Sequence, residues 1–405
     1  MILASDLQKI IASQYESLRI PENLVTRSVL NEIDPTIPFA IVLSGIRRCG
    51  KSTLLFQLLQ KFQSMNYLNF EDPRLVNFEL SDFERVDKLF NEKENASDLY
   101  FFDEIQNVDR WEMFVRSLLD QNKHVILTGS NSSLLSRELG SRLTGRHLQF
   151  ELFPFNYTEF LSFSGKIPGT GSFSDYIETG GFPEFIRFER IQILQQLLSD
   201  ILNRDIAVRN NIRNVRQLNE LIIFLLANTG KPFSLNGLQK SFQFGSVNTV
   251  KDFISYFEDA YLVFTIPKFA YSLKKQATNP KKTYAIDTGM IKANTTRFSE
   301  DHGRLLENIV FLHLRRKYDS IFYFKEKNEC DFVVFEKDKI TKAFQVCYEL
   351  NDGNMQRETA GCKEAMQMFG LNESSIITLE QEDTINEGDL KINIEPAWKW
   401  FSTFE

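Results

Sequence analysis

One short segment combines glycines, a lysine and a hydroxyl group at fixed spacing. Residues 45–52 read Gly-Ile-Arg-Arg-Cys-Gly-Lys-Ser, which fits the pattern G-x-x-x-x-G-K-[ST] at every fixed position. Glycines let backbone N–H groups close around phosphates, and the start of a helix favours negative charge. We therefore expect Lys51 to reach the β- and γ-phosphates of ATP and the Ser52 hydroxyl to bind Mg²⁺. The other expected nucleotide contacts are Gly45, Arg48, Cys49, Gly50 and Thr53.

An apolar run that ends in two carboxylates supplies the second half of such a site. Residues 99–104 read Leu-Tyr-Phe-Phe-Asp-Glu. We expect Asp103 to bind the metal together with Ser52, and Glu104 to act as the general base that activates water. The adjacent glutamate favours hydrolysis over transfer to a hydroxyl substrate. The chain has no Asn-Lys-x-Asp guanine-recognition sequence, which argues for ATP rather than GTP.

Two further polar groups could complete the catalytic machinery. The next apolar run leads into Ser130 and Asn131, and either side chain could position the attacking water and sense the γ-phosphate; the alternative is a plain polar turn. A later segment carries arginines, of which Arg146, or second Arg142, could reach the γ-phosphate of a neighbouring subunit. A surface ion pair is the alternative for either arginine.

Alternating strand and helix patterns are expected to position these residues. Helical spacing, as in residues 53–62 and 113–119, separates the strand-like runs. This alternation predicts an α/β fold with a mostly parallel sheet and helices on both faces. The strand-like runs are residues 39–43, 66–70, 99–102, 124–128 and 147–153.

The pattern changes after Pro154. Mostly helical segments extend to residue 227, and residues 233–286 then read as helix, turn, helix and β-hairpin, the layout of a winged helix. From residue 305, a helix, three strands and a further helix predict a second, small α/β domain.

With these residues in hand, the chain resembles a family of bacterial and archaeal AAA-type ATPases that carry AAA_14 and DUF4143 domains. The resemblance implies an AAA+ P-loop core with a helical lid, a winged helix and a terminal domain like the restriction-endonuclease fold. The expected domains are 1–155 (core, with an N-terminal helix over 1–30), 156–215 (lid), 216–290 (winged helix) and 291–405 (DUF4143). The matching phrases are residues 44–53 (SGIRRCGKST), 102–107 (FDEIQN), 127–130 (LTGS), 143–146 (LTGR), 153–155 (FPF), 180–184 (GGFPE), 280–289 (PKKTYAIDTG) and 306–310 (LENIV).

The resemblance also implies a nuclease-like site that has degenerated. Active relatives of that fold use a helix Glu, a strand Asp and a Glu-x-Lys on the next strand, and Glu307 and Asp331 match the first two. At the third position the chain has Gln345 and Cys347, which replace the carboxylate and the lysine. Mg²⁺ affinity should fall, and nothing obvious activates water. Glu349 could take the place of the missing carboxylate, but we favour a fold kept for structure or binding.

Charge is distributed unevenly over the 405 residues, whose formal net charge is −7. Residues 204–290 carry 12 basic and 6 acidic side chains, whereas the segments before and after them are acidic. The basic segment could bind DNA or pack against the acidic domains. Arg209, Arg213 and Arg216 are spaced for one helix face, and Lys274, Lys275, Lys281 and Lys282 belong to the predicted hairpin. The alternative is an architectural role for Lys281 and Lys282, because both belong to the PKKTYAIDTG phrase.

Composition limits the setting in which the protein works. The longest unbroken apolar run, residues 221–227, is far shorter than the roughly 20 residues of a membrane span, and the first ten residues do not resemble a secretory signal. The four cysteines lack metal-ligand spacing and a disulfide pattern. We therefore expect a cytoplasmic protein without membrane contact.

These observations predict a Mg²⁺-dependent AAA+-type ATPase whose hydrolysis moves the lid and winged helix and so acts on a partner. The partner is unknown, DNA is one candidate, and assembly into a homo-oligomer is a second expectation. One alternative is a nucleotide-controlled binding switch of signalling or toxin–antitoxin type with little turnover. The other is a DNA-directed nuclease-ATPase.

Overall fold

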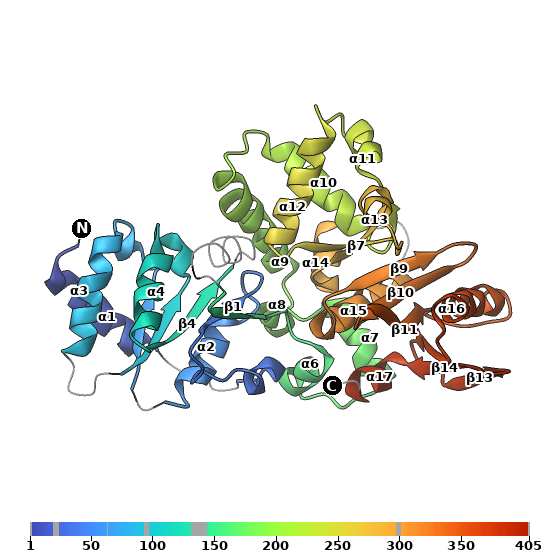
Figure 1. Ribbon diagram of the computed structural model, residues 1–405, viewed down its shortest axis with the longest axis horizontal. Coiled ribbons are helices and arrows are strands. Elements are labelled where there is room, and N and C mark those ends of the chain that lie inside the picture. Colours follow the sequence, from blue (N-terminus) through green and yellow to red (C-terminus); the bar gives the residue numbers. More distant parts are fainter. Residues whose placement is uncertain are drawn as a thin grey trace. The chain divides into compact units, whose positions relative to one another are not determined.

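The computed structural model divides the chain into two compact units, Met1–Phe153 and Pro154–Glu405 (Figure 1). The structure describes residues 2–18, 24–62, 64–92, 97–130, 143, 145–296 and 301–403. Within these ranges no helix is long and apolar enough to cross a membrane.

The first unit is built on a parallel sheet, as the sequence predicts. Its order is β2-β3-β4-β1-β5, and each neighbouring pair is parallel. All five predicted strand-like runs are strands here. β4 lies between β1 and β3, so the ends of these three strands are adjacent at one edge of the sheet. The strands are β1 (Ala40–Ser44), β2 (Asn66–Asn69), β3 (Leu99–Asp103), β4 (His124–Gly129) and β5 (His147–Glu151).

Alternating side chains of the strands face two layers of helices. Tyr100 and Phe102 share a buried cluster with Phe83 and Leu118 on one face, whereas Phe101 contacts Phe62 on the other. This alternation follows from the two-residue period of a strand. The helices are α1 (Ala4–Ser17), α2 (Lys51–Leu59), α3 (Leu80–Asn91) and α4 (Trp111–Asp120), with 3₁₀ turns at Ser28–Asn31, Pro73–Leu75 and Ile105–Asn107.

The N-terminal helix is shorter than the predicted 1–30. α1 ends at Ser17, residues 24–27 are not helical, and Ser28–Asn31 form a 3₁₀ turn. Pro21 in the sequence argues against one helix over the whole of 1–30, because a proline disfavours helical conformation in the residue before it and cannot donate a helical hydrogen bond.

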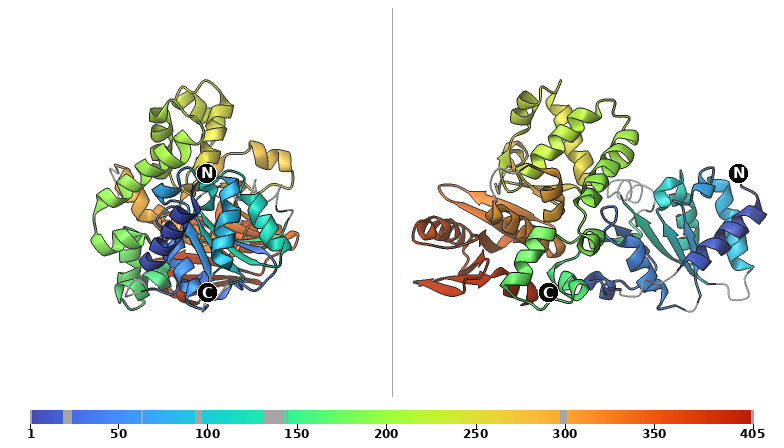
Figure 2. Two further views of the ribbon diagram at one scale, coloured as in Figure 1. Left: turned by 90° about the vertical axis from the view of Figure 1, so that its left-hand side faces the viewer. Right: turned by 180° about the vertical axis from the view of Figure 1, so that it is seen from behind.

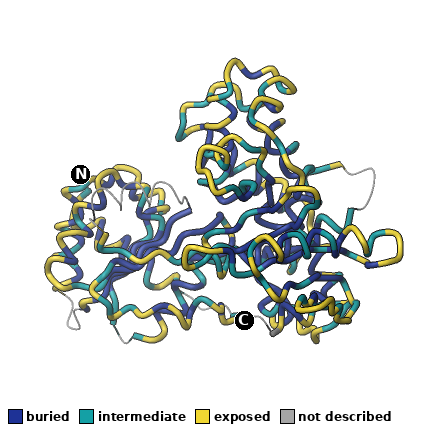
Figure 3. The backbone as a smooth tube through the Cα atoms, turned by 45° about the vertical axis from the view of Figure 1, so that its right-hand side comes forward, coloured by how far each residue is buried: buried dark blue, intermediate teal, exposed yellow. Residues whose placement is uncertain are grey.

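The second unit contains two sheets (Figure 2). A three-stranded antiparallel sheet has the order β6-β8-β7, and a six-stranded mixed sheet has the order β13-β14-β12-β11-β10-β9. Figure 3 shows that the buried stretches of backbone run through the interior and that the exposed stretches lie mainly at the surface. The strands are β6 (Pro232–Phe233), β7 (Val263–Pro267), β8 (Lys281–Ala285), β9 (Ile321–Lys325), β10 (Glu329–Glu336), β11 (Lys339–Val346), β12 (Glu373–Thr378), β13 (Asp383–Glu387) and β14 (Leu390–Pro396).

Helices precede, separate and follow these strands. Two sequence phrases meet among them: the Asp287 carboxylate accepts hydrogen bonds from Gly181 N at 2.6 Å and from Met290 N at 3.0 Å, and so caps α14. The helices are α6 (Tyr157–Ser164), α7 (Thr170–Thr179), α8 (Pro183–Phe188), α9 (Ile191–Asp200) continued by a π-helix (Ile201–Val208), α10 (Val215–Ala227), α11 (Leu235–Ser241), α12 (Val247–Asp259), α13 (Leu273–Thr278), α14 (Thr288–Asn294), α15 (His302–Lys317), α16 (Met355–Phe369) and α17 (Ala397–Thr403).

The structure confirms one local prediction for the basic segment and contradicts another. β7 and β8 pair antiparallel as the predicted hairpin requires, with α13 in the connection between them. Arg209, Arg213 and Arg216 do not share a helix face, because the π-helix ends at Val208 and α10 begins at Val215. The polar residues Asn210, Asn211 and Asn214 explain the break, because asparagine side chains favour caps and turns over helix interiors.

A buried histidine holds α17 against α15. His313 is 6% exposed, and its ring lies 4.8 Å from the ring of Trp400 and 4.6 Å from that of Phe401. Burial, with the nearby charges of Arg316 and Lys317, lowers the pKa of His313 to about 3. The histidine is therefore neutral in the folded protein at pH values where it is protonated in the unfolded chain.

This depressed pKa predicts a specific acid sensitivity. Between about pH 6.5 and pH 3 the unfolded state binds one more proton, so the free energy of unfolding should fall by up to about 1.4 kcal/mol per pH unit on acidification. His313→Phe should remove this slope, as measured by denaturant unfolding at about pH 7 and about pH 5. Phe401→Leu is the matched control, because it loosens the same contact and should destabilise equally at both pH values. An unchanged slope in His313→Phe would contradict the assignment.

Candidate functional site

The glycine-rich segment forms a loop between β1 and α2. β1 ends at Ser44, and α2 begins at Lys51 with Gly50 as its N-cap. Gly45 has φ +154°, and a Cβ atom there would lie 2.1 Å from Leu152 O, so a side chain is excluded. Gly50 has φ +100°, a conformation that glycine adopts without strain. The first-turn N–H groups of α2 have no partners within the helix and are therefore suited to bind anions.

Lys51 lies beneath this loop. Its side chain is 5% exposed, and its Nζ donates hydrogen bonds to Gly45 O at 3.0 Å and Ile46 O at 3.2 Å. Glu104 Oε1 is 3.7 Å from the same nitrogen. The loop carbonyls thus direct the ammonium group to the centre of the loop.

Three strand ends converge beside the loop, as the parallel sheet requires. Ser52 Oγ donates to Asp103 Oδ2 at 3.0 Å, and Thr128 Oγ1 donates to Asp103 Oδ1. Burial of the Asp103 carboxylate, together with the neighbouring Glu104, raises its pKa to about 6, whereas the two hydroxyl groups and Lys51 act in the opposite direction. The structure brings Ser52 and Asp103 together as the sequence predicts.

Glu104 has an uncommon backbone conformation. Its φ is +52°, in the left-handed region that non-glycine residues rarely adopt. Its N–H donates to Thr128 Oγ1 at 3.0 Å, and Gln106 Nε2 donates to its carboxylate. Strained backbone of this kind is concentrated at functional sites. The arrangement directs the carboxylate of Glu104 toward Lys51 rather than into the core.

Thr128 is a site residue that the sequence reasoning missed. Its hydroxyl joins the Asp103 carboxylate to the Glu104 backbone, and its side chain is fully buried. Its position at the end of an apolar strand-like run is the signal in the sequence that could have identified it. Ser130 follows β4 directly and is buried, whereas Asn131 lies outside the described residues.

Arg27 is a second missed residue. It is 4% exposed, and its guanidinium donates to Cys49 O at 2.8 Å and to Phe153 O at 2.6 Å. Its backbone N–H also faces Gln57 Oε1 of α2 at 3.5 Å. The arginine therefore ties the phosphate loop to the last residue of the first unit. Nothing local marks Arg27 in the sequence, because its partners are 22 and 126 residues away.

The side chains of the remaining predicted loop contacts differ in how far they are buried. Cys49 is fully buried, burial raises the pKa of its thiol, and its N–H already donates to Ile46 O at 3.3 Å. Arg48 has φ +64° and an exposed side chain, whereas the side chain of Thr53 is half-buried. The Cys49 side chain therefore supports the fold of the loop from the protein interior.

Arg146 lies at the other edge of the sheet. Its carbonyl accepts from Ala40 N at the start of β1, whereas the loop follows the end of that strand. Its guanidinium pairs with Asp120 at 2.6 Å and donates to Leu119 O at 2.9 Å. Arg142 lies outside the described residues. The role of Arg146 toward a neighbouring subunit stays a prediction.

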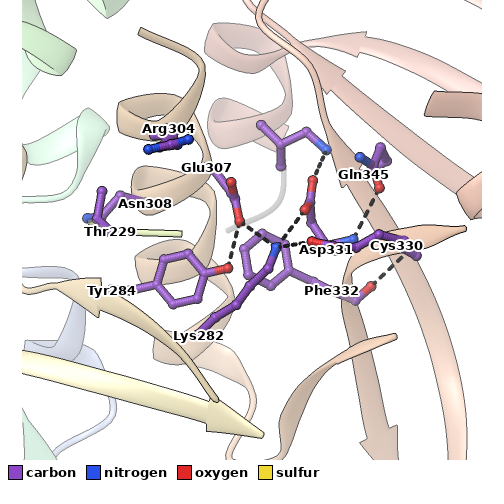
Figure 4. Close-up of polar contacts among 12 residues, drawn as sticks. Thr229, Lys282, Tyr284, Arg304, Glu307, Asn308, Cys330, Asp331, Phe332 and Gln345 are labelled. Carbon is purple, nitrogen blue, oxygen red and sulfur yellow. Dashed lines mark hydrogen bonds and ion pairs between the residues drawn. The ribbon is translucent and has the colours of Figure 1, made fainter. Parts of the chain in front are cut away.

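The nuclease-like residues converge only in part (Figure 4). Glu307 and Asp331 both contact Lys282 Nζ, at 3.1 and 2.9 Å, and Gln345 Oε1 accepts from Asp331 N at 3.1 Å. Cys347 does not join them; its thiol donates to Glu349 O at 3.2 Å, and burial raises its pKa to about 11.

Residues of two other elements contact the predicted nuclease-like residues. Gln345 Nε2 donates to Glu358 of α16 at 2.7 Å, and Lys282 of β8 contacts the two carboxylates named above. Glu349 is exposed and does not take the place of the carboxylate that β11 lacks. Lys282 is buried in its contacts and is therefore not available to DNA. Sequence reasoning missed Glu358 and Lys282 as partners of these residues.

The residues around the loop fit ATP and Mg²⁺. The donors beside Lys51 are a hydroxyl and a carboxylate, the oxygen ligands that Mg²⁺ prefers. The close approach of Leu152 O requires glycine at position 45. No side chain therefore covers the loop backbone where the loop begins. Among the described residues there is no cluster of three or more His, Cys, Asp or Glu side chains that could hold a metal ion by themselves.

Known proteins resemble the chain along most of its length. The sequence model of a family described as an AAA domain matches residues 38–161, and that of a domain of unknown function, DUF8612, matches residues 170–301. DUF8612 is a different family from the DUF4143 named from the sequence. The chain is 36% identical to uncharacterized protein MJ1544 of Methanocaldococcus jannaschii over 90% of its own length and 88% of the relative's.

Two more distant proteins also match. An uncharacterized protein of Haemophilus influenzae is 29% identical over 79% of this chain and 85% of the relative. The Walker-type ATPase PABY2304 of Pyrococcus abyssi aligns in structure over 72% of this chain and 95% of that chain, at 14% identity and a TM-score of 0.40. The AAA domain match covers the loop, β3 and β4, and so contains Lys51, Ser52, Asp103, Glu104 and Thr128, whereas Arg27 lies outside it.

Arg27 should be required for the shape of the loop. Arg27→Met leaves two buried carbonyl groups without donors, which should lower the free energy of unfolding by about 2–4 kcal/mol. It should also weaken ATP binding, measured by titration calorimetry, because the loop loses its tie to Phe153. Arg47→Met is the control: Arg47 lies in the same loop, but its pair with Glu71 is on the surface and worth about 0–1 kcal/mol. Equal effects of the two substitutions would refute the role of Arg27.

Proposed function

We propose that this chain, which belongs to the same family as MJ1544 of Methanocaldococcus jannaschii, binds ATP with Mg²⁺ at loop 45–52 and hydrolyses it. The observation that supports this most is the convergence of Ser52, Asp103 and Glu104 around a buried Lys51. These are the groups that phosphoryl transfer to water needs: a cation for the phosphates, oxygen ligands for the metal and a carboxylate for the water.

Each residue then has a distinct task. Lys51 and the first N–H groups of α2 would hold the phosphates, and Ser52 Oγ with Asp103 Oδ2 would hold the metal ion. Bound Mg²⁺ supplies charge neutralisation of the phosphate oxygens. The short chain of hydrogen bonds from Asp103 through Thr128 to the Glu104 backbone supports a fixed spacing between metal ligand and base. Glu104 Oε1, 3.7 Å from Lys51 Nζ, would accept the proton of the attacking water.

The second unit is proposed to transmit the nucleotide state to a partner. In this proposal residues 156–215 form a lid, 216–290 a winged helix and 291–405 a degenerate, DUF4143-like nuclease domain. The element order α10, β6, α11, α12, β7, β8 supports the winged helix. Ser130 or Asn131 would sense the γ-phosphate. Arg146 would act in a homo-oligomer, and the protein would work in the cytoplasm.

Glu104→Gln distinguishes hydrolysis from binding alone. Loss of the general base should reduce ATP turnover at least about 100-fold, whereas the affinity for ATP should stay close to that of the wild type. Lys51→Ala should instead abolish binding. Turnover would be measured by phosphate release and affinity by calorimetry, with Glu71→Gln as a surface control near the loop. Slow hydrolysis that Glu104→Gln leaves unchanged would refute the ATPase proposal and favour a nucleotide-controlled switch.

A second candidate function is DNA binding through the segment between β7 and β8. Residues 260–286 contain five lysines and no acidic residue. Two of these lysines are engaged within the unit: Lys268 pairs with Glu326 at 3.4 Å, and Lys282 is buried. These two lysines therefore fit the alternative interpretation, in which the basic segment makes contacts within the protein rather than with DNA.

The structure leaves a cationic and apolar surface on α13. Lys274 and Lys275 are exposed, and so are Tyr271 (78%) and Leu273 (79%) beside them. Lysines that neutralise phosphates, with apolar side chains that enter a groove, are a combination used by proteins that bind duplex DNA. Asp252, exposed beside Lys251 on α12, makes α12 less suited to the same task.

The double substitution Lys274→Ala/Lys275→Ala tests this surface. Affinity for a fluorescent duplex, measured by anisotropy at several salt concentrations, should fall, and the slope of log K against log salt should decrease by about 1.8 because two phosphate contacts are lost. Lys9→Ala/Lys88→Ala is the control, because both lysines are exposed on the first unit and carry the same charge. Equal losses in the two variants would indicate a nonspecific effect of net charge and reject α13 as the binding surface.

A further inference from the structure

The most completely paired charge in the described chain is the Lys282 ammonium group. Its side chain is 2% exposed, and Nζ lies 3.1 Å from Glu307 Oε1, 2.8 Å from Glu329 Oε1 and 2.9 Å from Asp331 Oδ1. An ammonium group has three N–H donors, and here three carboxylate oxygens accept them. No donor of Lys282 remains to bind a water molecule or a substrate.

The carboxylates have few oxygens left for a metal ion. Asp331 Oδ2 accepts from Val346 N at 3.1 Å, and Glu307 Oε1 also accepts from Tyr284 OH at 2.7 Å. Glu329 Oε2 pairs with Lys325 at 2.9 Å. Mg²⁺ binds oxygens at about 2.0–2.1 Å in octahedral geometry, and it would have to take the same oxygens that Lys282 holds.

The third ligand position is also unsuited to a metal. Gln345 is neutral; its Oε1 accepts from Asp331 N, and its Nε2 donates to Glu358 Oε2. Glu358 in turn pairs with Arg357. The residues of this nuclease-like site therefore do not fit the divalent metal ion that the fold resemblance implies.

We propose that the Lys282 ammonium group is a resident structural cation, which takes the place of a divalent metal ion in the carboxylate cluster and joins the three-stranded sheet to the six-stranded sheet without metal. Lys282 belongs to β8 of the small sheet, Glu307 to α15, and Glu329 and Asp331 to β10 of the large sheet. Burial alone would disfavour the charge of a lysine, but three carboxylate oxygens within 3.1 Å of Nζ stabilise the ammonium form of Lys282.

A neutral network extends the same joint. Asn308 of α15 accepts hydrogen bonds from Ala285 N and Thr229 Oγ1, both at 2.7 Å, and donates to Ala285 O at 2.9 Å. Tyr284 of β8 stacks on Phe311 of α15 with ring centroids 4.4 Å apart. Gly230 is required beside the cluster, because a Cβ there would lie 2.8 Å from Glu307 Oε2. β8 is thus held to α15 by charge, hydrogen bonds and ring contact together.

Thermal unfolding of the nucleotide-free full chain tests the proposal. The wild type should have the same Tm in excess EDTA and in millimolar Mn²⁺. Lys282→Met leaves three adjacent carboxylates, buried or partly buried, without their cation, so its Tm in EDTA should fall by about 5–10 °C. Mn²⁺ should raise that Tm again, and the rise should be lost in Lys282→Met/Asp331→Asn. Lys281→Met, the adjacent residue of β8, is the control and should shift the Tm by no more than about 2 °C.

Two results would overturn the proposal. The first is a Mn²⁺-dependent rise in the Tm of the wild type, or Mn²⁺-dependent plasmid nicking, that Asp331→Asn abolishes, because the ammonium group would then yield to a metal ion. The second is a Lys282→Met variant with an unchanged Tm and no response to Mn²⁺. If Lys282→Met does not fold, the comparison of wild type with Asp331→Asn still decides. No nucleotide is present in any of these measurements, so the outcome is independent of the ATPase proposal.

Discussion

An ammonium group removed from water must be surrounded by acceptors, and this chain meets that requirement twice in different ways. Lys51 has two backbone carbonyls near 3 Å and one carboxylate at 3.7 Å, so its charge is only partly matched. Lys282 has three carboxylates within 3.1 Å. The positive charge of Lys51 can therefore still attract an anion, whereas that of Lys282 is already neutralised by its own carboxylates. The same side chain therefore serves a binding site in one unit and a structural joint in the other.

The order of strands explains why the catalytic candidates meet. β4 lies between β1 and β3, so a residue at the end of β4 can contact both the loop after β1 and the carboxylates after β3. Thr128 occupies that place and orients Asp103 and Glu104 at once. Because all strands are parallel, their carboxyl ends share one edge, and short loops suffice to bring residues far apart in sequence together.

Local patterns were enough to predict the first unit in outline. Every strand-like run became a strand, and the pairing of Ser52 with Asp103 was expected from the motif and the apolar run before the carboxylates. What could not be predicted depends on distant partners. Arg27 and Lys282 have ordinary neighbours in the sequence, and their burial is decided by residues 22 to 126 positions away. The break at 209–214 was missed because arginine spacing matched a helix that the asparagines interrupt.

Two buried cations, Lys282 and Arg27, also restrict where motion can occur. Lys282 and Asn308 hold β8 to α15 and β10, so the two sheets of the second unit would move as one body. In the first unit, Arg27 contacts both Cys49 in the phosphate loop and Phe153, the residue at which the chain leaves that unit. A change in the loop on nucleotide binding would therefore act directly on the peptide before Pro154. Under the proposed function, Arg27 is therefore the residue of the first unit that would link the nucleotide state of the loop to the end of that unit at Phe153.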